Sequence, residues 1–231
     1  MISSRPPWIT NETWKLNERA LEAFSLSDSS HGKGLKHAFY HAEVHDFGTW
    51  LQLNDDEVKL RYGILDQIEK LITENIKSAQ VYMFGSTANR LALPGSDIDV
   101  LITVPHIANS QAYSLLFEVV EKLLRSSKDF VEVNPITDAQ VPIIQVTHKR
   151  TQVSVDIVIN RDDGLQGLAL VSILLNDFAE LRPLYFLVKA YLVYKNIHKP
   201  WKGGIGSFVL INMLTCYLQL RHTKRLASGE E

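Results

Sequence analysis

The feature that most constrains the fold is a change of hydrophobic spacing along the chain. Between residues 58 and 76, side chains that read as one helix face recur every three or four positions. Short runs rich in β-branched residues, typical of strands, follow at 81–84, 98–104, 130–133, 143–146 and 152–159. One helical segment, 110–125, interrupts them, and every periodic segment from residue 165 onward is helical. This order predicts an α+β fold in which a mixed sheet with flanking helices precedes a helical part.

Composition sets wide limits on function. The 231 residues suffice for one large or two small domains, and 24 Lys and Arg against 26 Asp and Glu give no bulk positive charge that would indicate a polyanion partner. The single cysteine, Cys216, excludes a disulfide framework and a cysteine-based metal site. The N-terminus lacks the apolar core of a signal peptide, and no apolar run has the length of a bilayer span. We expect a soluble, intracellular protein with no membrane partner.

Two acids, Asp97 and Asp99, stand at the head of a strand that otherwise reads as buried. Side chains alternate along a strand, so both carboxylates point to one face, where each raises the proton affinity of the other. A divalent cation would remove that conflict. The alternative is a turn residue at Asp97 and an arginine partner for Asp99, which leaves the next two features without an explanation.

A third acid, Asp156, lies within the strand "VSVDIVIN", on the face opposite Val155 and Ile157. An acid in the middle of a strong strand is unusual without a cationic partner. Three strand-borne carboxylates can hold two metal ions roughly 3.5–4 Å apart for an in-line phosphoryl displacement, and hard oxygen ligands suit Mg²⁺. Gly85 and Ser86 precede the acid pair, and a glycine where a strand turns lets backbone N–H groups approach a phosphate.

These segments carry a family resemblance. "FGSTANRLALPGSDIDVLI" and "VSVDIVIN" resemble the phosphate-loop, metal and third-acid motifs of the polymerase-beta nucleotidyltransferase superfamily. Within it, "LRPLYFLVKAYLVYKNIHKPWKGGIGSFVLINML" is similar to the helical motif of the RNA-surveillance poly(A) polymerases and the terminal uridylyltransferases. "PWIT" and "HAEVHDFGTWL" resemble the N-terminal segment of the surveillance polymerases, so the resemblance extends from about Pro7 to Leu220 and is best to the surveillance branch. The resemblance implies a nucleotidyltransferase palm joined to a helical central domain.

The resemblance also implies roles for single residues. The catalytic metal ligands would be Asp97, Asp99 and Asp156, with Asp156 also the base or orienter for the attacking 3′-hydroxyl. The expected nucleotide-binding residues comprise phosphate contacts (Gly85, Ser86, Lys189, Ser207), a base platform (Phe208) and a sugar contact (Asn160). Phe208 stands where the family usually has a tyrosine, and it keeps the stacking face but loses the hydroxyl.

Two other departures concern the helical part. The uridylyltransferases often have a second lysine four residues after the first, where this chain has Val193, and Lys195 is the candidate substitute. The family's helical domain continues past the position of Glu231, so we expect this chain to be a C-terminally truncated form. The expected domains are a flexible arm (1–34), a helix packing on the central domain (35–55), the palm (56–164) and an incomplete helical central domain (165–231).

The expected function is an RNA 3′-terminal nucleotidyltransferase, a polynucleotide adenylyltransferase that adds AMP from ATP with Mg²⁺ or Mn²⁺. The implied partners are an RNA 3′ end, a nucleoside triphosphate, and RNA-binding and helicase subunits of a surveillance complex, with a nuclear rather than cytoplasmic location. The alternatives are a terminal uridylyltransferase and a catalytically impaired, truncated module that only binds or scaffolds.

Three further signals stay secondary. His37, His41 and His45 would share one helix face, but the glutamate between them is misplaced for a zinc protease motif, and a helix packed beside the sheet with its histidines at the edge explains them. The basic run 221–225, "RHTKR", reads either as a solvated helix end or as an RNA phosphate contact. Lys189 alone would also suit the solvated side of an amphipathic helix.

Overall fold

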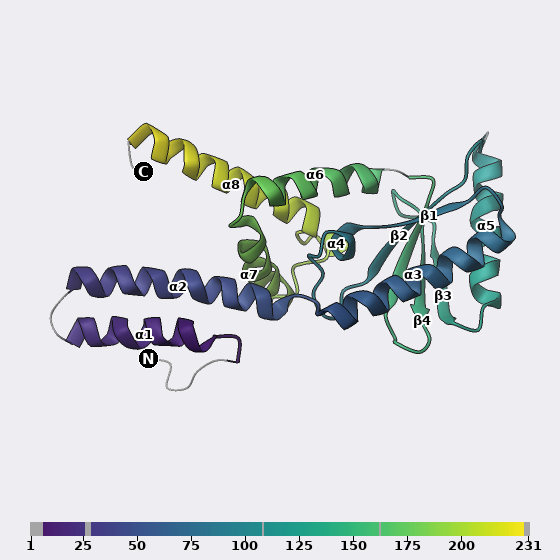
Figure 1. Ribbon diagram of the computed structural model, residues 1–231. Coiled ribbons are helices and arrows are strands. Elements are labelled where there is room, and N and C mark those ends of the chain that lie inside the picture. Colours follow the sequence, from purple (N-terminus) through teal and green to yellow (C-terminus); the bar gives the residue numbers. More distant parts are fainter. Residues whose placement is uncertain (1–6, 26–28, 108, 162, 229–231) are drawn as a thin grey trace. The chain divides into compact units, whose positions relative to one another are not determined.

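The computed structural model describes residues 7–25, 29–107, 109–161 and 163–228 (Figure 1). The chain divides into two compact units. One is continuous, Leu53–Ile173, and contains the sheet. The other joins two separated stretches, Met1–Gln52 and Leu174–Glu231, and its described part is helical.

The described strands of the continuous unit form one five-stranded mixed sheet in the order β1-β2-β5-β4-β3. The strands are β1 (Gln80–Phe84), β2 (Ile98–Thr103), β3 (Phe130–Ile136), β4 (Ile143–His148) and β5 (Ser154–Ile159). β2 and β5 pair in parallel, whereas β1–β2, β4–β5 and β3–β4 are antiparallel. Each strand overlaps a run identified from the sequence, and the α+β fold is confirmed.

Helices α3 (Asp55–Asn75) and α5 (Ser110–Ser126) cover one face of this sheet (Figure 1). α3 begins at a capping box in which the Asn54 side chain accepts from the Glu57 N–H and the Glu57 side chain accepts from the Asn54 N–H. The helices and the strands share one apolar core, whose fully buried members include Ile68, Ile72, Val120, Ile98, Val100, Ile144, Val155 and Ile157. Since strand side chains alternate, the neighbours of these residues point to the other face of the sheet.

Two more helices of this unit lie near that second face. α4 (Gly85–Ala88) is a single turn after β1, and α6 (Asp163–Asp177) follows β5. Gly164 at the start of α6 leaves room for the Phe84 ring, because a Cβ there would come within 2.5 Å of it. Ser172 Oγ also donates to Asn89 Oδ1 at 3.0 Å, so α6 is held to the segment after α4.

The other unit consists of α1 (Asn11–Ser25), α2 (Ser29–Leu51), the last turn of α6, α7 (Leu181–Tyr194), the 3-10 helix η1 (Pro200–Lys202) and α8 (Ser207–Ser228). α2 packs against both α1 and α7. A Cβ on Gly48 would lie 3.2 Å from the Pro183 Cα, so the α2 and α7 backbones approach closely there. The helix predicted within 35–55 therefore has α7 as a packing partner.

The prediction of a flexible arm over residues 1–34 is wrong where the structure describes them. Residues 11–25 form α1, and α2 begins at Ser29 rather than near residue 35. The cause is packing onto α2 that local polarity does not reveal: the Trp8 ring lies 5.2 Å from Phe47 and 5.8 Å from Trp50. Ile9 is buried, and the Thr10 N–H donates to Asp46 Oδ2 at 2.8 Å. Residues 1–6 and 26–28 of the predicted arm lie outside the described residues.

The unit limits also differ from the predicted palm limits of 56 and 164. The sheet-containing unit extends from Leu53 to Ile173 and so includes most of α6, which the sequence assigned to the helical part. In the part of the chain that the structure describes, no single helix is long and apolar enough to cross a membrane, although α6 and α7 taken together as a bent pair pass on length and composition.

Candidate active site

Three polar side chains form a row across the sheet, on the face opposite α3 and α5. Asp99 of β2 lies in register with Asp156 of β5, and Asp156 lies in register with Gln145 of β4. Residues in register on neighbouring strands project to the same side, so the sheet itself brings the two carboxylates together. Gln145 Nε2 donates to Asp156 Oδ1 at 3.0 Å and thereby fixes the orientation of that carboxylate.

Asp97 lies in the turn before β2, which Arg61 of α3 holds in place. Arg61 is only 4% exposed, and its Nη1 donates to the Ser96 carbonyl at 2.8 Å and to the Asp97 carbonyl at 3.5 Å. Thr87 Oγ1 also donates to the Asp97 carbonyl at 3.5 Å. The backbone at the head of β2 is thus tied to both α3 and α4, which limits where the Asp97 carboxylate can lie.

Gly85 and Ser86 are next to Asp99. Gly85 has a φ of +68°, and a Cβ at this position would overlap the Asp99 carboxylate. The Ser86 backbone N–H donates a hydrogen bond to that same carboxylate. The sequence predicted a close backbone approach to a phosphate at this glycine. In the structure the close approach is to Asp99, which by itself requires glycine here.

The carboxylates lie close enough to perturb one another. Burial, reinforced by the charges of Asp97 and Asp156, raises the pKa of Asp99 to about 8, against the lowering effect of the Ser86 N–H. Burial also raises the pKa of Asp156. The hydrogen bond from Gln145 lowers this pKa, and the charge of Asp97 raises it further. None of the ion pairs within 4 Å among the described residues includes any of the three acids.

This donor set suits a hard divalent cation, since half-buried carboxylates that repel one another lack a compensating charge. The acids are not arranged as a finished cation site, however. Within the described ranges, no group of three or more His, Cys, Asp or Glu side chains converges to metal-ligand spacing. The same holds for the three histidines of α2, where His41 and His45 only place their rings 4.7 Å apart.

Asn160 has a structural task at the end of β5. Its backbone is left-handed, with a φ of +49°, and its amide brackets Val104: Oδ1 accepts from the Val104 N–H at 2.7 Å and Nδ2 donates to the Val104 carbonyl at 3.0 Å. The side chain thus continues the β2–β5 pairing by one residue after the strands end. The sugar contact predicted for Asn160 stays a prediction.

The structure brings together Lys189 and Ser207, the two residues predicted to contact phosphates from the helical part. Lys189 Nζ of α7 donates to Ser207 Oγ, at the first residue of α8, over 3.0 Å. The Tyr185 hydroxyl, one turn before Lys189, makes a hydrogen bond of 3.1 Å to the same Ser207 oxygen. Lys189 therefore faces Ser207 rather than only extending from the solvated side of α7.

The remaining predicted residues of the helical part are exposed. Phe208 follows Ser207 with 49% of its surface exposed, so its ring is available for stacking on a base. Val193 is 40% exposed near the end of α7. Lys195, the candidate for the second lysine, has its ammonium 5.0 Å from the ring centre of Tyr194 and 5.8 Å from that of Tyr191, a cation–π arrangement that orients it along α7.

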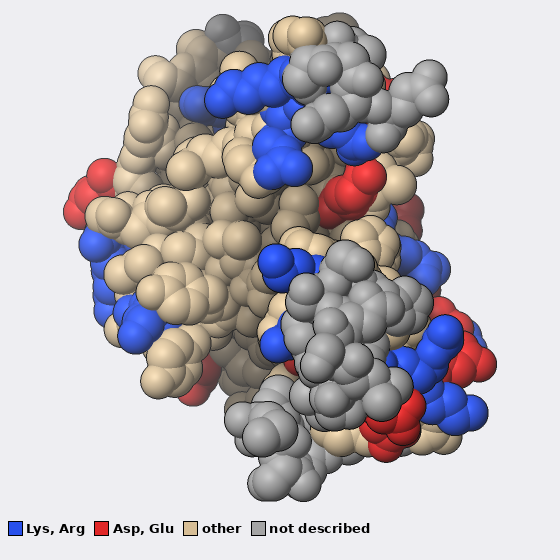
Figure 2. Space-filling model, turned by 90° about the vertical axis from the view of Figure 1, so that its left-hand side faces the viewer, with Lys and Arg blue, Asp and Glu red and all other residues tan. Residues whose placement is uncertain are grey.

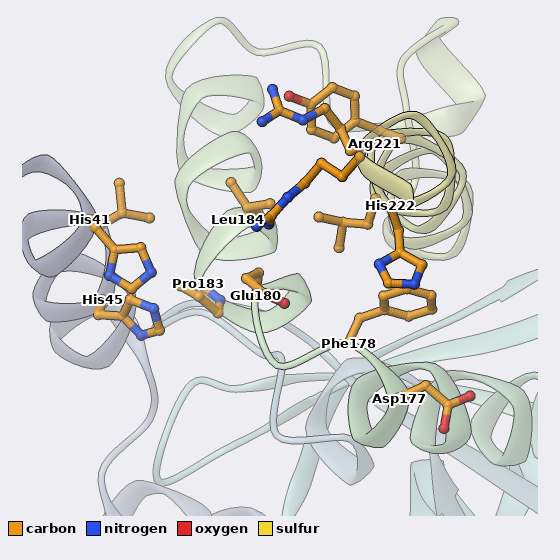
Figure 3. Close-up of a pocket in the computed structure, with 13 residues that line it drawn as sticks. His41, His45, Asp177, Phe178, Glu180, Pro183, Leu184, Arg221 and His222 are labelled. Atoms are coloured by element: carbon orange, nitrogen blue, oxygen red, sulfur yellow. The ribbon is translucent and has the colours of Figure 1, made fainter. Parts of the chain in front are cut away.

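A cavity of about 840 Å³ lies in the discontinuous unit, between α2, the α6–α7 turn and α8 (Figure 3). It joins two motifs that the sequence left without a role: His41 and His45 of α2 face Arg221, His222 and Arg225 of the basic run. Figure 2 shows Lys and Arg side chains gathered at the top of this face, where Figure 1 places the C-terminal part of α8. Acidic and apolar side chains also line the cavity, including Asp177, Phe178, Glu180 and Tyr217, so its lining does not single out one class of ligand.

Comparison with known proteins identifies the family. Residues 41–175, more than half of the chain, match the family described as poly(A) RNA polymerase, mitochondrial-like, central palm domain. This chain belongs to that family. The matched span contains the three acids, Gly85-Ser86 and Asn160, so the family match covers the candidate residues of the sheet-containing unit.

Curated relatives of this polymerase family member are poly(A) RNA polymerases. Poly(A) RNA polymerase cid14 of Schizosaccharomyces pombe is 28% identical over 190 residues, which cover 82% of this chain and 27% of the relative. Poly(A) RNA polymerase protein 1 of Saccharomyces cerevisiae is 26% identical, over 78% of this chain and 28% of its own length. The chain thus spans less than a third of these two proteins. A Drosophila melanogaster relative that is named inactive, Trf4-2, is 27% identical over 88% of this chain and 51% of its own length.

Solved structures show the same polymerase fold. The polymerase core of TRAMP, an RNA surveillance complex, superposes with a TM-score of 0.70 at 24% identity, covering 82% of this chain and 57% of that one. The GLD-2–GLD-3 poly(A) polymerase complex gives 0.69 at 20% identity over 77% of this chain and 57% of that one. The Cid1 poly(U) polymerase gives 0.62 at 22% identity over 73% of this chain and 50% of that one.

Sequence reasoning missed the residues that position the predicted ones. Gln145, Arg61 and Tyr185 all lie on runs that were assigned by hydrophobic spacing alone. The sequence signal for such a positioning residue is a polar or charged side chain at a core position of a helix, as at Arg61 in the helix 58–76. Nothing local marks Gln145 as the partner of Asp156, because that contact depends on the β4–β5 register.

Proposed function

We propose that this chain is the catalytic part of an RNA 3′-terminal nucleotidyltransferase that transfers AMP from ATP to RNA. The observation that carries the proposal is the in-register pair Asp99 and Asp156, two half-buried carboxylates beside Asp97 without a cationic partner within 4 Å among the described residues. The names of the curated relatives support adenylyl transfer. Uridylyl transfer, named for a solved structure of the same fold, is the alternative.

In the proposed mechanism Asp97, Asp99 and Asp156 would hold Mg²⁺ or Mn²⁺. A cation held there would supply charge neutralisation at the reacting phosphate and would lower the pKa of the attacking hydroxyl. Asp156 has Oδ1 engaged by Gln145, so its other oxygen is the one that orients the 3′-hydroxyl of RNA and accepts its proton.

Side chains of the helical part are proposed to contact the nucleotide. Lys189 and Ser207 are proposed to donate to the triphosphate, and the exposed Phe208 ring to stack on the base. The remaining partners, an RNA 3′ end and the RNA-binding and helicase subunits of a surveillance complex, are proposals that rest on the named relatives and structures. A nuclear location stays a prediction.

The direct test is the incorporation of labelled ATP into an oligo(A) primer. The purified chain should extend the primer with Mg²⁺, and an Asp97→Asn/Asp99→Asn variant should lose at least about 10²-fold in rate. UTP in place of ATP separates the two nucleotide preferences. Circular dichroism of the variant controls for folding, and equal incorporation by the wild type and the folded variant would contradict the proposal.

A second candidate is a module that binds its ligands but does not catalyse. The observation that favours it is the similarity to a relative named inactive. The three acids are present in this chain, so the discriminating measurement is binding rather than sequence. A ligand that binds only the native state raises the melting temperature. If Mg²⁺ and ATP raise the Tm and the chain also extends the primer, the enzyme is supported. If the chain binds oligo(A) but shows neither effect, the binding module is supported.

A further inference from the structure

Three side chains from two helices share one oxygen atom in the helical part. Ser207 Oγ, at the first residue of α8, lies 3.0 Å from Lys189 Nζ and 3.1 Å from the Tyr185 hydroxyl, both of α7. Tyr185 and Lys189 are four positions apart, so they lie one above the other on the same face of α7. Sequence comparison led to Lys189 and Ser207, but nothing assigned a role to Tyr185.

The hydrogens around Ser207 can be counted. A serine hydroxyl has one hydrogen to donate and two lone pairs to accept with, whereas a lysine ammonium only donates. Lys189 therefore occupies one lone pair of Ser207. A tyrosine hydroxyl can donate or accept, so the direction of the Tyr185–Ser207 bond decides where the Ser207 hydrogen points.

Burial settles that direction. Tyr185 has 0% exposure, and among the described residues its hydroxyl has Ser207 as its hydrogen-bond partner. If Ser207 donated to Tyr185, the phenolic hydrogen would be buried without an acceptor, an arrangement that folded proteins avoid. Tyr185 therefore donates, both lone pairs of Ser207 are occupied, and the Ser207 hydrogen has to find a third acceptor. Burial also raises the pKa of Tyr185, so the phenol keeps its hydrogen at neutral pH.

We propose that Tyr185 is a positioning residue for the triphosphate: by donating to Ser207 Oγ, it turns the Ser207 hydroxyl hydrogen outward, beside the Lys189 ammonium. Ser207 is half-buried and so can reach a bound ligand. An outward O–H next to an ammonium is a pair of donors suited to phosphate oxygens and to no cation. This inference rests on the proposed function, in which Lys189 and Ser207 meet the nucleotide's phosphates.

The competing role for Tyr185 is packing alone. Its ring is fully buried and lies 5.5 Å from the Phe186 ring in an edge-to-face arrangement. Tyr185→Phe keeps the ring and removes only the hydroxyl, which separates the two roles. Tyr113→Phe is the matched control, because the Tyr113 hydroxyl is also buried but has no hydrogen-bond partner in the described part of the chain.

Calorimetric titration with Mg²⁺–ATP and with inorganic tripolyphosphate tests the inference. Tyr185→Phe should weaken the binding of both by about threefold to tenfold, the loss of one oriented hydrogen bond, while Tyr113→Phe binds as the wild type does. Adenosine, which lacks phosphates, should bind the wild type and Tyr185→Phe equally. In primer extension the variant should raise KM for ATP with kcat nearly unchanged.

A double-mutant cycle shows whether Tyr185 acts through Ser207. In a Ser207→Ala background, Tyr185→Phe should have no further effect on tripolyphosphate binding. Unchanged affinity in the single variant, or the same loss in both backgrounds, would overturn the inference while leaving the triphosphate site intact. A folded wild-type chain that binds neither ATP nor tripolyphosphate would instead overturn the proposed triphosphate site, and the role of Tyr185 with it.

Discussion

At the scale of single residues, Gly85 and Asp99 depend on each other. The left-handed φ of +68° at Gly85 aims the next N–H at the Asp99 carboxylate, and the missing Cβ leaves that carboxylate its space. Gly95, in the turn before β2, also has a positive φ, of +86°, but a Cβ there would meet nothing within 4 Å. A substitution at Gly95 therefore introduces backbone strain alone, whereas a substitution at Gly85 introduces the same strain and a collision with Asp99.

Replacing each glycine with alanine should give two different outcomes. Gly95→Ala should lower the free energy of unfolding by about 1–2 kcal/mol, the cost of a left-handed alanine. Gly85→Ala carries the same strain and must also displace Asp99, so it should destabilise more and abolish primer extension. Chemical denaturation and the extension assay measure both effects. Equal stability and equal activity of the two variants would show that the Asp99 carboxylate does not depend on this glycine.

His148 provides a second residue-scale prediction, for the dependence of stability on pH. It is 3% exposed, its Nδ1 lies 2.7 Å from Thr151 Oγ1, and its Nε2 lies 3.2 Å from Gln67 Oε1. Burial lowers the pKa of His148 below 6.5, partly offset by Asp129 and supported by Arg150. A lowered pKa in the folded state means that folding favours the neutral ring. The contribution of His148 to the free energy of unfolding is therefore complete above pH 6.5 and is lost as pH falls through the lowered pKa.

Protonation of His148 should therefore subtract stability as pH falls from 7 to 5, so the free energy of unfolding of the wild type should decline relative to that of His148→Gln, which cannot take up the proton. His148→Gln can be less stable at pH 7 because it loses packing, so the comparison is between slopes. His106→Asn, at an exposed loop position with a φ of +62°, is the control and should keep the wild-type slope. Parallel curves for the wild type and His148→Gln would exclude His148 as the titrating group.

At the scale of elements, α3 positions the head of β2 through Arg61. Replacing Arg61 with methionine keeps most of the apolar volume but leaves the Ser96 carbonyl without its donor. We expect the free energy of unfolding to fall by about 1–3 kcal/mol. Because Asp97 is then less restrained, the Mg²⁺ concentration needed for half-maximal activity should rise.

Arg90→Met is the matched control for this element. Arg90 lies 3.6 Å from Asp55 in a pair whose side chains are 64% and 85% exposed, and such surface pairs contribute about 0–1 kcal/mol. Urea denaturation and magnesium titration of both variants decide the matter. If Arg61→Met and Arg90→Met behave alike, the Arg61 contact to the turn has no part in holding Asp97.

The elements also show what the sequence could and could not predict. Strand positions were predictable because side-chain alternation and β-branched content are local, and Asp99 and Asp156 were identified because acids in buried strands are rare. The register that pairs them, and pairs Asp156 with Gln145, is a contact between distant strands that no local pattern encodes. α1 was missed for the same reason, since its surroundings come from α2 and the Trp8–Phe47–Trp50 cluster.

At the scale of the whole molecule, the two units differ in how the chain builds them. The sheet unit comes from one continuous segment, and the buried members of its hydrophobic core cluster extend from Ile64 to Ile159. The other unit needs two segments, because α2 from the first packs against α7 from the second. A continuous segment with its own core can fold by itself, whereas half of a discontinuous unit lacks its packing partner.

A fragment of residues 53–177, which keeps α6 whole, should therefore fold without the rest of the chain. It should show a cooperative thermal transition by circular dichroism, and Ile157→Ala, at a fully buried position of β5, should destabilise it by about 2–5 kcal/mol. The same substitution should cost the full chain a similar amount, since both carry the same core. A fragment of residues 178–231 should show no cooperative transition, because the α2 face that α7 packs on is absent. A fragment 53–177 without a cooperative transition would mean that the sheet depends on the helical segments for its stability.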